Sequence, residues 1–359
     1  MTAVPAGRIP VAVLGATGAV GQTFVRLLDG HPWFVLAEVA ASERSAGKPY
    51  REATRWLEGA LPPRVGDLPV RACAPGDVTA PIVFSALDAA AAGEIEAAFA
   101  RDGRLVLSNA KNYRMDPDVP LMIPEVNADH AGLLAVQRRL RGWSGAIVTN
   151  ANCAATVAAI ALAPLHEAFG VRQLFVATMQ AVSGAGYPGV PSLDILGNVI
   201  PFIGDEEPKV ERELPKLLGR FADGSIELAP FRTSAHTNRV PVEHGHTVCM
   251  SVGFDRAPDA AAAAETLRAW RGAAGVADLP SAPRPPIVVT DAENRPQPRR
   301  DVGTGGGMTV VVGRVRPDPV LDLRLVALGH NTVRGAAGGS VLNAELLVAR
   351  GLAPVPSVA

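Results

Sequence analysis

The chain has 359 residues, a length that is typical of two domains rather than one. Its hydrophobic content of 48% is enough for two packed cores and excludes a chain that is mainly disordered. The formal net charge is −1, with 34 basic and 35 acidic residues, and this balance argues against nucleic acid or an anionic membrane as a partner.

Strand-like and helix-like segments alternate over the first 110 residues. Residues 11–14 are a short apolar run typical of a buried parallel strand, and a glycine-rich turn follows at 15–21. The apolar spacing of 22–28 predicts a helix, and 33–41 predict a second strand, so the segment has the size of a βαβ unit. The alternation continues with two further expected strands and an Ala- and Glu-rich helix, at 82–86, 105–108 and 91–101.

The pattern changes after residue 150. Residues 153–165 predict a buried helix, 187–203 are rich in Gly, Pro and apolar residues, and 277–301 predict a surface loop. The remaining expected elements are strands at 174–179, 248–253 and 308–315 and a last helix at 335–349. Because a helix so late in the chain can return to the first domain, we expect one domain from 1–150 plus 330–359 and a second from 151–329.

The cysteines and the N-terminus bear on location and metal content. The three cysteines are widely spaced and form no CxxC pair, which argues against an ordinary zinc site. Their sparse, odd number fits a reducing cytosol. The N-terminal sequence has no charged-then-apolar signal pattern, and the longest apolar stretch is too short to cross a bilayer. We therefore expect a cytoplasmic protein without a structural metal.

The three glycines of the turn, Gly15, Gly18 and Gly21, form a GxxGxxG pattern between a strand and a helix. Gly15 permits the tight turn, and Gly18 lets backbone N–H groups approach a pyrophosphate at the positive end of the helix. Such a pattern alone is weak evidence, and a purely structural turn is the alternative. Its place inside a βαβ unit predicts a Rossmann-type dinucleotide-binding domain in an α/β protein.

The residues after the second predicted strand bear on the choice of dinucleotide. Sites for NAD usually carry an acidic residue there, which binds the ribose 2′-hydroxyl group. Ser42, Arg44 and Ser45 instead offer charge-assisted hydrogen bonds to a 2′-phosphate. Glu43 would suit NAD, and Arg44 as a plain surface charge is the alternative. On balance the segment predicts NADP.

Cys153 stands where the polar segment Asn150-Ala151-Asn152 meets the apolar helix. A thiol at a helix N-terminus has its pKa lowered, because the helix dipole and the free N–H groups favour the thiolate. The alternative is that Cys153 is a small buried hydrophobic residue. The polar flank favours a nucleophile. No tyrosine is followed by a lysine four residues on, which argues against the tyrosine-dependent short-chain reductases.

Three of the seven histidines, His236, His244 and His246, lie close together in the sequence with Arg239 among them. One of them is a candidate base, a metal site built on His244 and His246 is an alternative, and Arg239 suits a carboxylate substrate. A dinucleotide, a nucleophilic cysteine and a histidine together suit one chemistry. The thiolate attacks an acyl or aldehyde carbon, and a hydride moves to or from the nicotinamide.

Strings of residues along nearly the whole chain resemble aspartate-semialdehyde dehydrogenase, and more closely its archaeal and fungal branch. They stand in the order of that family and are far more specific than any single motif above. The matching strings are GATGAVGQ (15–22), SNAKNYRM (108–115), DVPLMIPEVN (118–127), NANC (150–153), QAVSGAGYPGVPSLDILGNVIPFIGDEEPK (180–209), NRVPVEHGH (238–246) and GHNTVRGAAGGSVLNAELL (329–347).

The resemblance implies roles for the residues nearest the chemistry. Cys153 is implied as the nucleophile that forms an acyl thioester, and Asn152 lies beside it. Gln180 is implied as the residue that orients the acyl group. His246 is implied as the acid or base, and its choice over His244 rests on spacing alone.

Substrate and cofactor contacts follow from the same resemblance. Arg114 and Lys209 are implied as phosphate contacts, Glu206 as the contact of the substrate amine, and Arg239 as the contact of its α-carboxylate. Glu206 and Lys209 as an ordinary surface pair on a helix is the alternative. The cofactor residues, from the glycine pattern, the 42–45 segment and the resemblance, are Gly15, Thr17, Gly18, Ala19, Val20, Gly21, Ser42, Arg44, Ser45, Ser183, Gly184 and Asn331.

The fold implied is a Rossmann-type NADP-binding domain with an inserted α+β catalytic and dimerisation domain. The reaction implied is reduction of L-4-aspartyl phosphate by NADPH to aspartate semialdehyde and phosphate, in lysine, methionine and threonine biosynthesis, by a homodimer or homotetramer. The alternatives are a malonyl-CoA reductase, an N-acetyl-glutamyl-phosphate reductase, or a non-catalytic NADP-binding regulatory protein. Small-molecule substrate and phosphate are the expected partners, with neither nucleic acid nor membrane among them.

Overall fold

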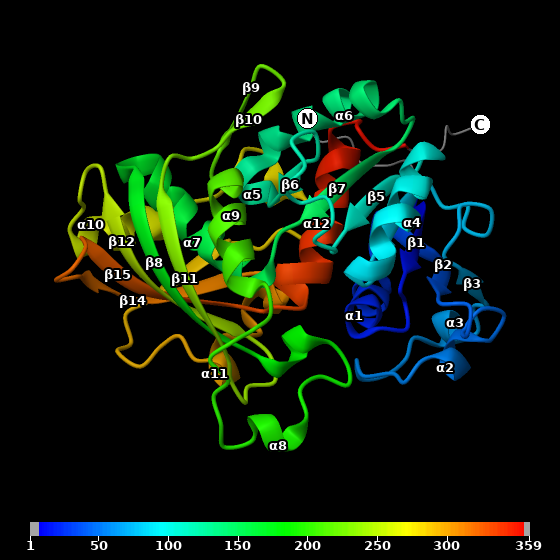
Figure 1. Ribbon diagram of the computed structural model, residues 1–359, viewed down its shortest axis with the longest axis horizontal. Coiled ribbons are helices and arrows are strands. Elements are labelled where there is room, and N and C mark those ends of the chain that lie inside the picture. Colours follow the sequence, from blue (N-terminus) through cyan, green and yellow to red (C-terminus); the bar gives the residue numbers. More distant parts are fainter. Residues whose placement is uncertain (1–6, 355–359) are drawn as a thin grey trace.

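The computed structural model describes residues 7–354, so the first six and last five residues of the expected first domain lie outside it. Two large sheets stand side by side along the long axis of the molecule (Figure 1). One has seven strands in the order β3-β2-β1-β4-β5-β7-β6, and the other has six in the order β11-β8-β12-β15-β14-β13. The expected α/β architecture, with a Rossmann-type sheet and a second, mixed sheet, is confirmed.

Every strand pair of the seven-stranded sheet is parallel. Its central strands read as continuous apolar runs because helices cover both faces of a parallel sheet. The strands are β1 (Ile9–Leu14), β2 (Phe34–Ala41), β3 (Val70–Ala72), β4 (Ile82–Ser85), β5 (Leu105–Ser108), β6 (Leu121–Met122) and β7 (Ala146–Asn150). The accompanying helices are α1 (Ala19–Leu28), α2 (Tyr50–Ala53), α3 (Pro63–Gly66), α4 (Ala89–Arg101), α5 (Pro124–Asn127) and α6 (Leu133–Arg141).

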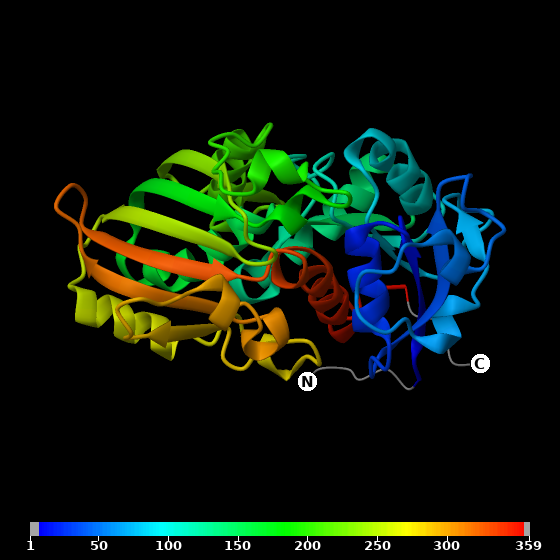
Figure 2. The same cartoon turned by 90° about the horizontal axis from the view of Figure 1, so that it is seen from below.

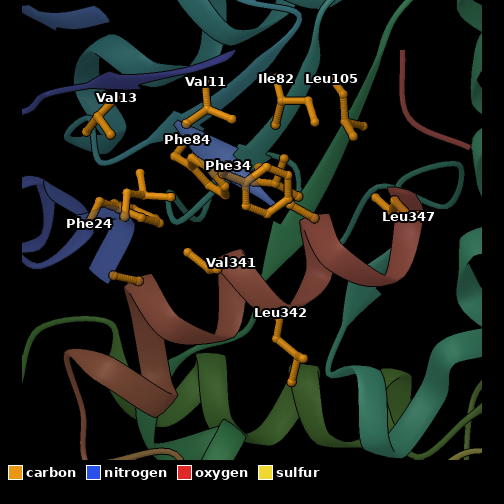
Figure 3. Close-up of a cluster of buried hydrophobic side chains, with 14 of the residues drawn as sticks. Val11, Val13, Phe24, Phe34, Ile82, Phe84, Leu105, Val341, Leu342 and Leu347 are labelled. Carbon is orange, nitrogen blue, oxygen red and sulfur yellow. The ribbon is translucent and has the colours of Figure 1, made fainter. Parts of the chain in front are cut away.

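The last helix, α12 (Gly338–Ala349), completes the core of this first sheet. Its Val341 and Leu347 lie in one buried cluster with Phe24, Phe34 and Phe84 (Figure 3). The residues from 338 to 348 are all buried, as expected for a helix that is apolar on every side. Figure 2 shows why, since α12 lies between the two sheets. The predicted helix at 335–349 is therefore present from Gly338, and Val333–Ala337 form a wider π turn before it.

The six-stranded sheet is mixed: β8, β12, β15 and β14 pair antiparallel, and the outer strands β11 and β13 pair parallel to their neighbours. Its strands are β8 (Val171–Gln180), β11 (Arg232–Arg239), β12 (His246–Phe254), β13 (Ile287–Thr290), β14 (Val310–Pro317) and β15 (Leu323–Gly329). The helices α7 (Cys153–Phe169), α9 (Glu206–Leu217) and α10 (Ala260–Ala269) pack on it. Smaller elements are α8 (Ser192–Ile195), the β9–β10 hairpin (Arg220–Ala222 with Ser225–Glu227) and α11 (Pro298–Asp301).

One sequence prediction in this half is wrong. The segment 277–301, expected to be a surface loop, contains the strand β13, which pairs with Val310–Gly313 of β14. Its apolar residues Ile287 to Val289 join the sheet edge, and the prolines and arginines that dominate the composition flank them. Among residues 7–354 no helix is long and apolar enough to cross a membrane.

Candidate active site

The predicted site residues meet in a cleft of about 450 Å³ between the two sheets. Its wall includes the segment that follows β7, the start of α7 and residues from β8, α9 and β11. Among the residues expected from the sequence, those lining it are Val20, Arg114, Asn152, Cys153, Gln180, Ser183, Gly184, Glu206, Lys209, Arg239 and Asn331. His246 lies behind this wall, fully buried. Segments more than 200 residues apart in sequence thus share one cleft.

The polar flank of Cys153 forms a helix cap. Asn152 is the N-cap of α7, and its side-chain Oδ1 accepts hydrogen bonds from the N–H groups of Ala154 and Ala155 at 2.9 and 3.0 Å. These bonds satisfy two donors that a helix start leaves free. The side-chain nitrogen of Asn152, Nδ2, also donates to Glu206 Oε1 at 2.7 Å. Cys153 is therefore the first residue of a capped helix, and its cap residue is hydrogen-bonded to Glu206 of the cleft wall.

The thiol of Cys153 lies against His246. The sulfur is 3.1 Å from His246 Nε2, and the other ring nitrogen, Nδ1, accepts a hydrogen bond from the N–H of Ala181 at 3.1 Å. A neutral imidazole that accepts at Nδ1 carries its proton on Nε2, so the N–H of His246 points at the sulfur. Burial lowers the pKa of His246 to about 3, with Arg239 and His330 acting in the same direction, so the ring is neutral at pH 7.

The expected lowering of the thiol pKa is wrong for this structure. Although Cys153 keeps some exposure to the cleft, desolvation of its sulfur raises the pKa to about 12, and the Glu206 carboxylate adds to the rise. Arg114, Arg239 and the N–H of Ala154 act in the opposite direction but do not outweigh burial. The helix start is present as predicted, and the neutral thiol is the favoured form.

Four charged side chains form the wall around the thiol. Arg239 donates to the carbonyl of Ala181 at 2.8 Å, and burial lowers the pKa of its guanidinium. Lys209 Nζ is 3.3 Å from Glu206 Oε2 on the same helix, and both side chains are largely buried. Arg114 reaches the cleft from the loop after β5. Because these groups are mostly removed from water, they are more than the exposed surface pair that the sequence left open.

Gly184 is required by close packing at this wall. A Cβ atom on Gly184 would lie 2.8 Å from the Arg239 guanidinium and 3.1 Å from Cε1 of His246. A Cβ atom on Gly335 would similarly lie 2.6 Å from Cβ of Cys153. Any larger residue at either position would displace a group of the site. Close packing thus explains why glycine stands at both positions.

Sequence reasoning missed Glu213 and Lys216, which lie further along α9. Glu213 accepts hydrogen bonds from Arg114 and from the N–H of Asn152, at 2.9 and 2.5 Å. Lys216 Nζ donates to the carbonyls of Arg114, Asp116 and Val119 at 2.7 to 2.9 Å. Burial lowers the pKa of Lys216 to about 8. The available signal was spacing, because Glu213 and Lys216 follow Glu206 by seven and ten positions, on the same helix face.

A second cavity of about 640 Å³ adjoins the cleft along the carboxyl ends of β1 and β2. Gly15, at φ +70°, forms the turn, and a Cβ atom there would lie 2.6 Å from the carbonyl oxygen of Ala86. The start of α1 faces this cavity, and a helix N-terminus suits a pyrophosphate. The predicted cofactor residues that line it are Gly15, Thr17, Gly18, Ala19, Val20, Ser42 and Arg44.

Two predicted cofactor residues lie elsewhere. Gly21 packs in the first turn of α1 too close to the Gly15 carbonyl for any Cβ atom, so its role is helix packing. Ser45 does not line the cavity and donates its N–H to Ser42 in a turn at 2.8 Å. Between the cavity and the cleft, Asn331 donates to Ser183 Oγ at 2.8 Å.

The structure separates the neighbouring histidines that the sequence left as alternatives. His244 Nδ1 lies 3.0 Å from Ser183 Oγ and does not line the cleft, whereas His246 lies at the sulfur. His236 is exposed on β11 and packs against Phe175. Within residues 7–354 no group of three or more His, Cys, Asp or Glu side chains is arranged to hold a metal ion.

Two family models match the chain. One is described as semialdehyde dehydrogenase, NAD binding domain, and matches residues 10–133. The other is described as semialdehyde dehydrogenase, dimerisation domain, and matches residues 162–334. The first spans most of the parallel sheet and the second most of the mixed sheet.

Full-length relatives are similar in sequence and in structure. The aspartate-semialdehyde dehydrogenase of Archaeoglobus fulgidus is 51% identical over 345 residues, covering 95% of this chain and 98% of the relative. That of Schizosaccharomyces pombe is 47% identical, covering 95% and 98%. The crystal structure of the Candida albicans enzyme with NADP superposes with a TM-score of 0.88 at 41% identity, covering 96% of this chain and 99% of that one.

Proposed function

The chain belongs to the aspartate-semialdehyde dehydrogenase family, and we propose that it interconverts L-4-aspartyl phosphate and L-aspartate 4-semialdehyde plus phosphate with NADP. The observation that carries this proposal is the contact of 3.1 Å between Cys153 Sγ and His246 Nε2, in a cleft walled by Arg114, Glu206 and Arg239. A nucleophilic thiol surrounded by groups for a carboxylate, an amine and a phosphate suits this substrate. The reaction belongs to amino-acid biosynthesis, toward lysine, methionine and threonine.

Cys153 forms and breaks the covalent bond. Its sulfur attacks the acyl carbon of aspartyl phosphate, the C–O bond to phosphate breaks, and a thioester remains, while the S–H proton leaves with the phosphate as hydrogen phosphate. When bound, NADPH supplies the hydride that reduces this thioester. The resulting tetrahedral adduct then expels the sulfur and releases the aldehyde. In the opposite direction the same thioester is attacked by phosphate.

His246 and Gln180 act on the acyl group. As the tetrahedral adduct forms, its oxygen gains negative charge, and the Nε2–H of His246 is a fixed donor 3.1 Å from the sulfur. Of the expected acid and base roles, His246 thus performs that of the acid. Gln180 lines the same cleft, and its Nε2 donates to Thr178 Oγ1 at 3.3 Å. That contact keeps the amide at the wall, where it orients the acyl group.

Charge complementarity selects the substrate. The guanidinium of Arg239 binds the α-carboxylate, and the carboxylate of Glu206 binds the ammonium group. Arg114 and Lys209 bind the phosphate, whose charge grows as it leaves. In the ≈ 640 Å³ cavity, Gly15 to Val20 would hold the pyrophosphate of the cofactor and Ser42 and Arg44 its 2′-phosphate, while Ser183, Gly184 and Asn331 of the cleft would contact its nicotinamide end.

The chain carries a dimerisation domain, and we propose that it forms a homodimer or a homotetramer. Alternate residues of β8 and β11 face away from the core and include Phe175, which is 43% exposed and packs on His236. A second copy covering this sheet face would bury Phe175, as the cores of protein interfaces bury aromatic side chains. Residues 151–329 would then supply both the catalytic wall and the contact between copies.

The test runs in the oxidising direction with purified protein, aspartate semialdehyde and NADP. NADPH absorbance should rise only when phosphate is present, and arsenate should replace phosphate. Cys153→Ser should abolish turnover while cofactor still binds, because serine offers no thiolate. Cys249→Ser, a half-buried thiol on β12, is the matched control and should stay active. Phosphate-independent reduction of malonyl-CoA, without semialdehyde oxidation, would replace the proposal with the CoA-thioester reaction.

A further inference from the structure

A second carboxylate, Glu213, lies behind the wall of the cleft and has no part in the proposed reaction. It stands seven residues after Glu206 on α9, two helical turns along the same face. Its side chain is only 2% exposed, and it does not line the cleft that holds Cys153. A carboxylate this deeply buried needs partners for both of its oxygens.

Each oxygen of Glu213 serves a different part of the site. Oε1 accepts a hydrogen bond from Nη1 of Arg114 at 2.9 Å, and Oε2 accepts one from the backbone N–H of Asn152 at 2.5 Å. Arg114 is the proposed phosphate contact, and Asn152 is the cap residue directly before Cys153. One rigid group therefore connects the cation for the phosphate to the peptide that carries the nucleophile.

We infer that Glu213 is a positioning residue that sets the place of the phosphate relative to the Cys153 sulfur. This inference rests on the proposed function. Bonds to an ionised carboxylate are strong and directional, so they hold both partners closely. Attack at the acyl carbon needs the sulfur over one face of the carbonyl while the phosphate is held at the same carbon, and small displacements of such groups are costly in rate.

A carboxylate is needed here, and an amide cannot replace it. A glutamine has one acceptor oxygen, whereas Arg114 and the N–H of Asn152 are both donors. In either orientation the NH₂ group of glutamine would face one of these donors, and that contact would be lost. The backbone near Arg114 would stay in place, because Lys216 Nζ donates to the Arg114 carbonyl at 2.7 Å. Glu213→Gln thus releases the Arg114 guanidinium or the Asn152 peptide while the fold stays unchanged.

The experiment compares Glu213→Gln with the matched control Glu211→Gln. Glu211 lies on the same helix and also accepts a backbone N–H, that of Ala235 at 3.0 Å, but it faces β11 and not the cleft. In the oxidising direction, kcat of Glu213→Gln should fall about tenfold or more. Its KM for phosphate should not rise, because loss of a negative charge beside Arg114 favours the anion. Glu211→Gln should stay within about twofold of wild type in both constants.

A double-mutant cycle separates positioning from general damage. Lysine at position 114 cannot reach both Glu213 and the carbonyl of Asn109, which Arg114 Nη2 contacts at 2.8 Å. Arg114→Lys should therefore reduce kcat strongly in the wild type and less in the Glu213→Gln background. In the Glu211→Gln background the reduction of kcat should be as large as in the wild type. Additive effects, a rise of KM at unchanged kcat, or equality of the two glutamine variants would overturn the inference. Absence of phosphate-dependent turnover in the wild type would instead overturn the proposed function, and this inference with it.

Discussion

Removal of one partner from the buried ion pair between Arg334 and Glu125 should strongly destabilise the protein. Both nitrogens of the Arg334 fork lie 2.7 Å from the two Glu125 oxygens, and the side chains are 1% and 2% exposed. Arg334 belongs to the π turn before α12, and Glu125 belongs to α5. Removing one partner leaves a charge buried without compensation, which costs about 3–5 kcal/mol. That is a large part of a total stability of roughly 5–15 kcal/mol.

Equilibrium unfolding in urea measures this cost. Glu125→Leu and Arg334→Met should each lower the free energy of unfolding by about 3–5 kcal/mol, whereas the double variant should lose much less than the sum, because it buries no charge. Arg220→Gln is the control, since its ion pair with Glu227 is exposed and its loss should leave the free energy of unfolding nearly unchanged. Single variants that cost under about 1 kcal/mol, or a double variant equal to the sum, would refute the reasoning.

Two further predictions concern the cofactor and the thiol. Arg44→Ala should raise KM for NADP about tenfold or more and leave KM for NAD nearly unchanged, because only NADP has the 2′-phosphate. Steady-state kinetics with both cofactors measures the two KM values. Equal effects on both would contradict the prediction. In a Cys73→Ser, Cys249→Ser background, alkylation of Cys153 by iodoacetamide should accelerate about tenfold per pH unit from pH 7 to 9, since a pKa of about 12 leaves thiolate scarce throughout. A rate independent of pH in that range would show that thiolate already dominates at neutral pH.

The parallel sheet was predictable from the sequence where strands are continuous apolar runs. β1, β4 and β5 match the runs read from the sequence, because strands buried on both faces need apolar residues at every position. β11 was not predicted, since Arg232–Arg239 is polar at most positions. Its strand conformation comes from pairing with β8 along its whole length. Such tertiary pairing leaves no local pattern.

The candidate site was predictable where residues stand in specific strings, and it was incomplete where function depends on burial. Cys153 and Arg239 were named from sequence and lie in one cleft. Glu213 was missed, because acidic residues are common on helix surfaces and its burial comes from the packing of α9 beside α7. The pKa of the Cys153 thiol was predicted too low for the same reason. The helix dipole can be inferred from local sequence, whereas desolvation depends on all the residues that surround the sulfur.

The position of α12 has a consequence for how the protein is made. On the ribosome, the first six strands of the parallel sheet and β7 are complete once Asn150 has emerged, but the helix that packs beside Phe24 and Phe84 begins only at Gly338. At ordinary synthesis rates the delay is roughly 10–40 s. During that time an apolar face of the sheet waits for its cover, and the second domain is synthesised in the interval. The nascent chain thus passes through a stage at which chaperones have a defined surface to protect, and docking of α12 then completes the core of the parallel sheet.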